Sequence, residues 1–271
     1  MVGSVESGGA RITYEVTGPA GAPPLLLVNS IGATRDVLWA RQVPAFSRAF
    51  RVITYDPRGH GQSSSPPGEY TLDDLGRDAV AVLDAAGVER AHVCGISMGG
   101  ITVLWLGIHA PGRVNRLVAA NTAARIGSLQ SWSDRIALVR AEGLDGVAEQ
   151  AMPRWFTEPF RQRDPETIER FRQMVATNSK DGYLGGCAAL RDGGLRDALP
   201  RITSPLLGIA GAEDLLTPPE ALAFVRDQVR GATLQTLPCS HLSNVERSEE
   251  FNESVLTFLA SDQLIRNPTA S

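Results

Sequence analysis

The chain has 271 residues and a formal net charge of −4 at pH 7. This length suits one α/β domain with an insertion and a sizeable core. The sequence has no basic cluster of the kind that binds nucleic acid, and no apolar run long enough to cross a membrane. Residues 1–10 also lack the positive and apolar segments of a signal peptide. We therefore expect a cytoplasmic protein that binds neither nucleic acid nor a membrane.

Strand and helix patterns alternate along the first half of the chain. Residues 11–16 alternate between apolar and polar side chains, as in a half-buried strand. Thr71 and Asp74 form a start like a capping box for a helix that Gly87 ends. The other patterns predict strands at 24–28, 51–55, 91–94 and 116–120, and a helix at 101–109. This alternation predicts a mostly parallel sheet that helices cover on both faces.

The alternation stops near residue 121 and resumes near residue 204. The stretch between them has helical spacing at 132–141, 147–156 and 165–176. These helices could be extra core, but they leave from the carboxyl end of a strand, where sites form in α/β sheets. We therefore predict an α/β core of residues 1–121 and 204–271, and a helical cap of residues 122–203. The core then continues with strands at 206–210 and 233–237, and residues 267–271 form a frayed tail.

The most informative segment is Cys-Gly-Ile-Ser-Met-Gly-Gly at residues 94–100. A Gly-x-Ser-x-Gly pattern by itself is usually a plain turn. Here an apolar strand precedes it and an apolar helix follows it, as in a nucleophile elbow that raises the serine above the sheet edge. Glycines at 95 and 99 let the two backbones approach closely. Ser97 is therefore the predicted nucleophile.

An acid and a histidine follow the serine in the order that this arrangement requires. Asp214 follows the strand at 206–210 and a glycine turn, and His241 follows the strand at 233–237. The acid would hold the histidine in the correct tautomer. Glu213 and Glu246 are rival acids, the first being one position too early and the second being expected to open the last helix.

The remaining histidines and the cysteines are better explained as structural residues. His92 lies in a predicted strand, His109 at the end of a predicted helix, and His60 in a loop that it can order. Cys94, Cys187 and Cys239 are odd in number and lack metal-site spacing, so they indicate reduced thiols. A Cys239 nucleophile would leave Ser97 without a purpose. We expect no metal and no cofactor.

An acyl-transfer site also needs two backbone N–H groups that point at the oxyanion. One comes from the residue after the nucleophile, Met98. The loop at residues 29–32 follows a buried strand, and Ile31 is its best-placed donor, although such a loop could be a simple turn. Losing one such donor costs roughly 10²- to 10³-fold in rate in a comparable hydrolase.

With these residues, the chain resembles the α/β-hydrolase superfamily and, more narrowly, is similar to the 3-oxoadipate enol-lactonases of aromatic catabolism. The resemblance runs from about residue 14 to about residue 259. The elbow, the 56–61 loop, Asp214 and His241 are shared by the whole superfamily. The segments that resemble the narrower group are 29–32, 182–192, 211–219 and 241–246. Gly186 departs from these lactonases, which often have a second cysteine or another residue there, and this affects cap packing and substrate choice.

The resemblance implies a small five-membered enol-lactone substrate that carries a carboxylate and is opened to 3-oxoadipate without a cofactor. It implies that Trp132 and Arg135, which lie three apart on one helix face, contact this substrate, because arginine binds a carboxylate bidentately. Arg191 is a second candidate. Without the resemblance, Arg135 would be a solvated surface charge, and Trp155 could be cap core.

Four other functions remain open from the sequence. The same scaffold serves general carboxylesterases, other lactonases and hydrolases of carbon–carbon bonds, and fold and triad do not separate these. Some chains with this fold are ligand receptors with slow hydrolysis. The partner that we expect is a small lactone or ester, and the sequence leaves the oligomeric state open.

Overall fold

The computed structural model describes residues 1–266, and the predicted frayed tail at 267–271 lies outside the described residues. One eight-stranded sheet has the order β1-β2-β4-β3-β5-β6-β7-β8. The pairs from β4 to β8 are all parallel, whereas β2 pairs antiparallel with β1 and β4. The strands are β1 (Val2–Ser7), β2 (Ala10–Thr17), β3 (Pro24–Val28), β4 (Arg51–Tyr55), β5 (Ala91–Ile96), β6 (Val114–Ala120), β7 (Leu206–Gly211) and β8 (Thr233–Leu237). The predicted mostly parallel sheet is confirmed.

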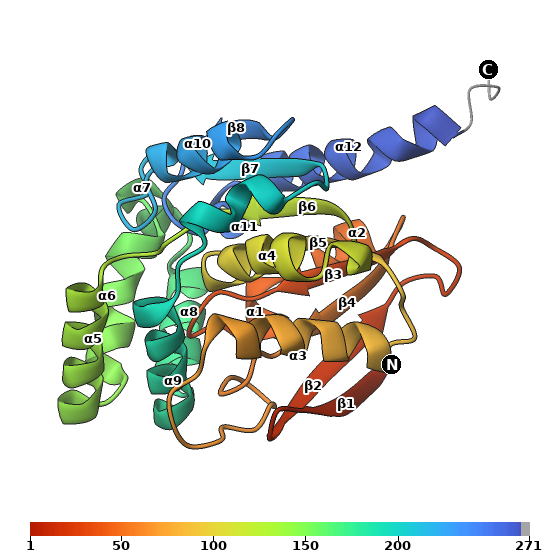
Figure 1. The fold of residues 1–271 in the computed structure, drawn as a ribbon. Coiled ribbons are helices and arrows are strands. Elements are labelled where there is room, and N and C mark those ends of the chain that lie inside the picture. Colours follow the sequence, from red (N-terminus) through yellow and green to blue (C-terminus); the bar gives the residue numbers. More distant parts are fainter. Residues whose placement is uncertain (267–271) are drawn as a thin grey trace.

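Helices cover both faces of this sheet (Figure 1). On one face, α3 packs against α4, which contacts β5 and β6, and α10 contacts β7. On the other face, α2 contacts the long carboxyl-terminal helix α12. The covering helices are α1 (Arg35–Leu38), α2 (Val43–Phe46), α3 (Leu72–Ala85), α4 (Met98–His109), α10 (Pro219–Gln228), α11 (Ser243–Glu246) and α12 (Ser248–Arg266). None of the helices within residues 1–266 is long and apolar enough to span a membrane.

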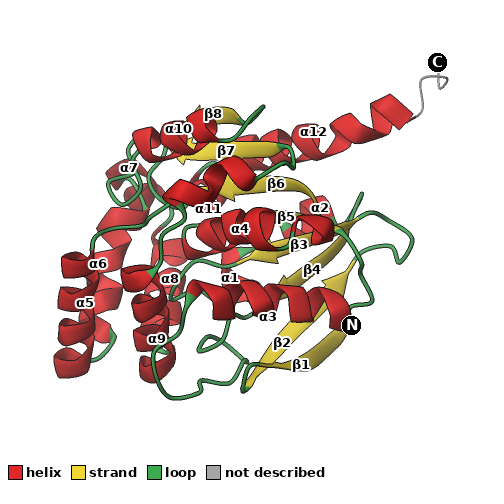
Figure 2. Ribbon diagram, in the orientation of Figure 1, coloured by secondary structure: helices red, strands yellow, loops and turns green. Residues whose placement is uncertain are grey.

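Five further helices lie between β6 and β7, at the edge where the parallel strands end (Figure 2). Helices α5 and α9 contact each other, and so do α6 and α8. Their bounds are α5 (Leu129–Glu142), α6 (Asp145–Trp155), α7 (Glu158–Arg163), α8 (Pro165–Ala176) and α9 (Lys180–Asp192), followed by the 3-10 helix η2 (Arg196–Arg201). Helices therefore surround the sheet edge at which loops from several strands meet.

Local patterns in the sequence predicted most of these helices and strands correctly. The capping box that begins α3 is present, because Thr71 Oγ1 accepts from the Asp74 N–H at 3.1 Å and the Asp74 carboxylate accepts from the Thr71 N–H at 2.9 Å. The helix predicted at 101–109 begins earlier, at Met98, directly after the serine. Residues 2–7 form β1, a strand that no sequence pattern predicted, and pair with β2 across the turn at Gly8 and Gly9.

Candidate active site

Ser97 lies between β5 and α4, in the sharp turn that the glycine pattern predicted. Its φ of 58° lies in the left-handed region, which strains a residue with a β-carbon. A β-carbon on Gly95 would come within 2.3 Å of the Gly99 carbonyl oxygen, and one on Gly99 within 2.0 Å of the Val28 carbonyl oxygen. Only glycines therefore allow β3, β5 and α4 to approach closely enough to form this turn.

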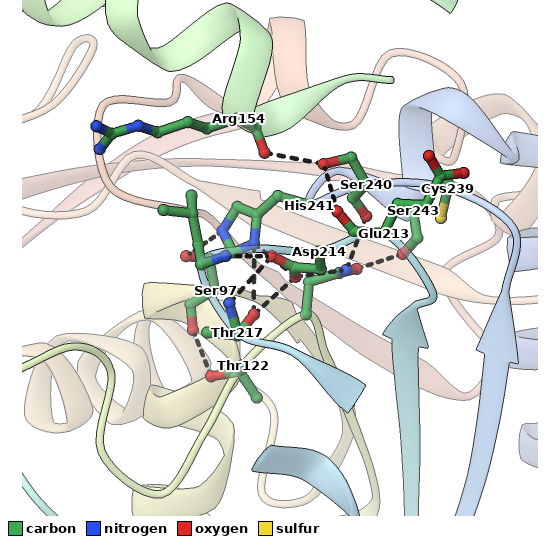
Figure 3. A network of polar contacts seen from close by, with 12 residues as sticks. Ser97, Thr122, Arg154, Glu213, Asp214, Thr217, Cys239, Ser240, His241 and Ser243 are labelled. Atoms are coloured by element: carbon green, nitrogen blue, oxygen red, sulfur yellow. Dashed lines mark hydrogen bonds and ion pairs between the residues drawn. The ribbon is translucent and has the colours of Figure 1, made fainter. Parts of the chain in front are cut away.

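Ser97, His241 and Asp214 form one hydrogen-bonded chain (Figure 3). The distance from Ser97 Oγ to His241 Nε2 is 2.9 Å, and that from His241 Nδ1 to Asp214 Oδ2 is 2.8 Å. The three residues follow β5, β8 and β7, and all three are at least 95% buried. The fold thus brings together, in hydrogen-bonding order, the three residues that the sequence suggested.

His241 and several hydrogen-bond donors keep Asp214 ionised. Its carboxylate accepts hydrogen bonds from the N–H groups of Leu216 (2.9 Å) and Thr217 (3.0 Å), the Thr217 hydroxyl (2.8 Å) and the Asn121 side-chain amide (3.1 Å). Burial alone would raise the pKa of Asp214, but His241 and these donors outweigh burial and lower the pKa to about 2. A permanently charged acid can hold the imidazole in one tautomer and stabilise the imidazolium.

Neither rival acid contacts His241. Glu213 is exposed. Glu246 is buried and accepts hydrogen bonds from the Ser240 N–H at 3.3 Å, the Thr157 N–H at 3.2 Å and the Thr157 hydroxyl. Glu246 ends the short helix α11, so the prediction that it opens the last helix is wrong. The chain turns between α11 and α12, which the sequence pattern did not reveal.

The other three histidines have packing or loop contacts. His92 meets the Phe50 ring edge-on, and His109 stacks on Trp105. His60 Nε2 lies 2.9 Å from the Gly32 nitrogen, so it accepts that N–H, and His60 Nδ1 lies 3.0 Å from the Arg58 carbonyl oxygen. This geometry requires a neutral ring with the proton on Nδ1. Burial supports that state, since it lowers the pKa of His60 to about 4.

The three cysteines are free and buried. Burial raises the pKa of the Cys239 thiol, with a further contribution from Glu246, so this sulfur stays protonated and is a poor nucleophile. No group of three His, Cys, Asp or Glu side chains within the described residues could hold a metal ion.

Ile31 and Met98 each carry a backbone N–H with no hydrogen-bond partner among residues 1–266. Met98 is the first residue of α4, and the first N–H groups of a helix have no partner inside the helix. Ile31 lies in the loop after β3, and its neighbour Gly32 is held by His60. Ile31 lines the same cavity as Ser97. Both N–H groups are therefore free to bind an oxyanion.

A cavity of about 160 Å³ opens over Ser97 and His241. This volume is below the roughly 300–1,000 Å³ typical of pockets for larger ligands, so the cavity suits a small molecule. Its lining comes from the loop at residues 29–32, the loops that carry the triad, and helices α5, α6 and α9 with the residues just before α5. The lining residues are Ser30, Ile31, Ser97, Ile126, Gly127, Ser131, Trp132, Arg135, Ala151, Arg154, Trp155, Tyr183, Leu216 and His241.

Trp132 and Arg135 line this cavity, whereas Arg191 does not. The Arg191 guanidinium lies 2.8 Å from Glu69 and 2.6 Å from Asp192, and these ion pairs hold it outside the cavity. The sequence-based assignment of Arg191 to the substrate is therefore dropped. Its partner Glu69 lies 122 positions away in sequence, so no local pattern could have shown this pairing.

Arg154 is the cavity residue that sequence reasoning missed. It lies on α6, and within the described part of the chain neither Arg154 nor Arg135 has a carboxylate partner. Burial raises the pKa of the Tyr183 hydroxyl, and the positive charges of Arg135 and Arg154 oppose part of this rise. The Trp155 ring packs edge-on against Phe171 and also lines the cavity.

Comparison with known proteins agrees with this architecture. A family model described as alpha/beta hydrolase fold matches residues 23–248. The hydrolase from Pseudomonas aeruginosa PA01 has a crystal structure with a TM-score of 0.92 and 45% identity, covering 95% of this chain and 98% of that one. The chain therefore belongs to the α/β-hydrolase family.

Two further relatives define its place in that family. The 3-oxoadipate enol-lactonase 2 of Acinetobacter baylyi is 43% identical over 244 residues, which are 90% of this chain and 91% of the relative. The crystal structure of the enol-lactonase from Burkholderia xenovorans LB400 has a TM-score of 0.93 at 36% identity, covering 95% of this chain and all of the other. The chain is a carboxylic-ester hydrolase of the 3-oxoadipate enol-lactonase family.

Proposed function

We propose that this enzyme opens the ring of 3-oxoadipate enol-lactone to give 3-oxoadipate, as a step in the breakdown of aromatic compounds. The observation that carries the proposal is a small cavity holding a Ser-His-Asp chain beside two arginines that no protein carboxylate pairs. Unpaired guanidinium groups at a serine nucleophile suit an anionic ester. The resemblance to named enol-lactonases supports the same substrate.

In the proposed acylation step, His241 Nε2 takes the Ser97 hydroxyl proton while Ser97 Oγ bonds to the lactone carbonyl carbon. The carbonyl oxygen becomes an oxyanion that the N–H groups of Ile31 and Met98 bind. Collapse of this intermediate breaks the ring carbon–oxygen bond. The departing enolate oxygen takes the proton from His241 Nε2, which gives the enol and restores the neutral imidazole. An enolate is a better leaving group than the nitrogen of an amide, so it depends less on this proton.

In the deacylation step, His241 takes a proton from a water molecule, whose oxygen bonds to the acyl carbon. The bond to Ser97 then breaks, and the serine oxygen recovers its proton from His241. The released acid carries a second carboxylate, and its enol tautomerises to the ketone. Asp214 stays charged throughout and stabilises the imidazolium in both steps.

Arg135 binds the carboxylate of the lactone in this proposal, with Trp132 as an apolar wall beside the ring. The Trp132 indole N–H donates to the Ile126 carbonyl oxygen at 2.7 Å, which fixes the plane of the ring. Arg154 adds a second positive charge to the same cavity. A β-carbon on Gly186 would come within 3.2 Å of the Ile31 side chain, so the glycine allows α9 to pack closely on the residue that lines the cavity.

The proposal includes residues 122–203 as a cap over the site, since three helices of this segment line the cavity. It also includes a cytoplasmic enzyme whose partner is a small molecule and which binds neither nucleic acid nor a membrane. The buried, unpaired thiols suit a reducing compartment.

The role of the arginine is tested by comparing the free-acid lactone with its neutral methyl ester. We expect wild-type kcat/KM to favour the acid by about tenfold or more, because a charge-assisted hydrogen bond contributes about 1.5–3 kcal/mol. Arg135→Ala should lower kcat/KM for the acid and leave the ester nearly unchanged. Arg191→Ala is the matched control, since it removes an arginine that lies outside the cavity. Equal rates on acid and ester in the wild type would contradict anion recognition.

A further inference from the structure

Glu246 is a buried carboxylate that the proposed reaction does not use. It lies five residues after His241 and is 6% exposed. Among the side chains of residues 1–260 no arginine, lysine or histidine pairs with it, and its contacts there are two backbone N–H groups and one hydroxyl. Burying a carboxylate that only neutral donors stabilise costs free energy, so the position of these donors matters.

The donors belong to two different parts of the molecule. Glu246 Oε2 accepts from the Ser240 N–H at 3.3 Å, next to the catalytic histidine. The same oxygen accepts from the Thr157 N–H at 3.2 Å, and Oε1 accepts from the Thr157 hydroxyl. Thr157 is the residue that caps α7, directly after α6. The carboxylate therefore joins the histidine loop to the helical segment above it.

Two more hydrogen bonds run parallel to this connection. The Ser240 hydroxyl donates to the Arg154 carbonyl oxygen at 2.9 Å (Figure 3), and the Leu242 N–H donates to the Trp155 carbonyl oxygen at 3.1 Å. Ser240 and Leu242 flank His241 on either side. The residues before and after the histidine are thus both fixed to the last turn of α6.

That turn of α6 is also a wall of the substrate cavity, because Arg154 and Trp155 line it together with His241. A shift of the wall would therefore move the imidazole, and a shift of the histidine loop would move the wall. Proton transfer depends strongly on this placement, since an error of about 1 Å can cost about 10²-fold in rate.

We propose that Glu246 is a positioning residue, which acts through Ser240 and Thr157 to hold His241 and the Arg154–Trp155 wall in one fixed arrangement. The proposal rests on the proposed serine chemistry, but it does not depend on which ester is the natural substrate. Glu246 touches no reacting atom, so its removal should lower kcat and leave the nucleophile in place.

The test measures kcat and KM on p-nitrophenyl acetate, a small neutral ester, for Glu246→Ala, Glu246→Gln and Glu249→Ala. Glu249 is an exposed glutamate in the first turn of α12, and its variant is the matched control. We expect Glu246→Ala to lower kcat by roughly tenfold or more with KM changed by less than about threefold. Glu246→Gln should recover most of kcat, because its carbonyl oxygen can accept from both N–H groups.

Thr157→Val provides a second variant that leaves the buried carboxylate and the Thr157 N–H in place. It should lower kcat by a smaller factor, and circular dichroism should show that it is folded. A folded Glu246→Ala enzyme with wild-type kcat would overturn the proposal, as would a Glu246→Gln enzyme no better than Glu246→Ala. Ser97→Ala is run beside them. If it retains activity, the proposed serine chemistry fails, which is a result separate from the Glu246 comparison.

Discussion

At the scale of single residues, the site depends on one serine held in a strained turn. The Ser97 hydroxyl contacts His241, and its φ of 58° is maintained by the glycines around it. Such strain costs of order 1–3 kcal/mol and persists only where the surrounding structure enforces it. The elbow therefore directs the hydroxyl into the cavity at the expense of local stability.

Ser97→Ala should lower kcat on any ester by several orders of magnitude, since the loss of a serine nucleophile costs about 10⁶-fold in a comparable enzyme. The fold should survive, because the alanine removes one oxygen and keeps the turn. Steady-state rates and thermal unfolding of the same preparation check both statements. Substantial activity in a folded Ser97→Ala enzyme would contradict the assignment of the nucleophile.

Residues with a local signature were predictable from the sequence. The elbow at Ser97 shows a strand, a glycine-flanked serine and a helix, and Asp214 and His241 each follow an apolar strand. Arg154 has no such signature, because its place in the cavity depends on how α6 packs above the sheet. Arg191 was misassigned for the same reason, since its partner Glu69 comes from a distant loop.

At the scale of elements, His60 links the loop at 56–61 to the loop that carries Ile31. Its neutral ring accepts the Gly32 N–H, and protonation would replace that acceptor with a second donor. The pKa of His60 is lowered by burial to about 4, below its ordinary value of 6.5. The unfolded chain therefore binds a proton at a higher pH than the folded chain does.

Stability should accordingly fall as pH decreases from about 6.5 to about 4. The contribution of His60 is fully present above its unfolded pKa and amounts to about 3 kcal/mol over this range. His60→Gln cannot titrate and should show a flatter decrease in the free energy of unfolding. Urea unfolding of both proteins at several pH values checks this. Parallel decreases in wild type and variant would contradict a buried neutral His60.

Helix α9 packs closely against the 56–61 loop. A β-carbon on Gly182 would come within 2.0 Å of the Gly59 carbonyl oxygen, which belongs to the backbone and has little freedom to move. Gly182→Ala should destabilise the protein by about 1–3 kcal/mol or more. It should also raise KM, because the next residue, Tyr183, lines the cavity.

Gly146→Ala on α6 is the matched control for this substitution. A β-carbon there would meet only the Glu142 carboxylate at 3.5 Å, so the change should be neutral or stabilising by up to about 1 kcal/mol. Thermal unfolding and KM measured for both variants check the pair. Equal stability of the two alanine variants would show that α9 does not pack on Gly59 as described.

At the scale of the whole molecule, parallel strands bring the site together. The carboxyl ends of β5, β7 and β8 lie at one edge of the sheet, and residues 97, 214 and 241 meet there despite their separation in sequence. The strand–helix alternation made this sheet predictable. The edge strand β1 was not, because its exposed and half-buried residues carry little apolar pattern.

The helices between β6 and β7 form the other side of the cavity. They place Trp132, Arg135 and Arg154 over the serine, and in the proposed function these residues select a small anionic lactone. In this proposal the general hydrolase chemistry belongs to the sheet edge, whereas substrate choice belongs to the helices. Hydrolase chemistry and substrate choice can be tested separately with an ester whose cleavage needs only the hydrolase chemistry.

The most direct test is the steady-state rate on freshly generated 3-oxoadipate enol-lactone, followed by the loss of its ultraviolet absorbance, beside p-nitrophenyl acetate as a neutral ester. We predict rapid turnover of the lactone and a kcat/KM at least about a hundredfold lower on the neutral ester, because that ester lacks the anion and the ring that the proposed cavity binds. Slow turnover of the lactone together with rapid cleavage of the neutral ester would contradict the account and would identify a general carboxylesterase.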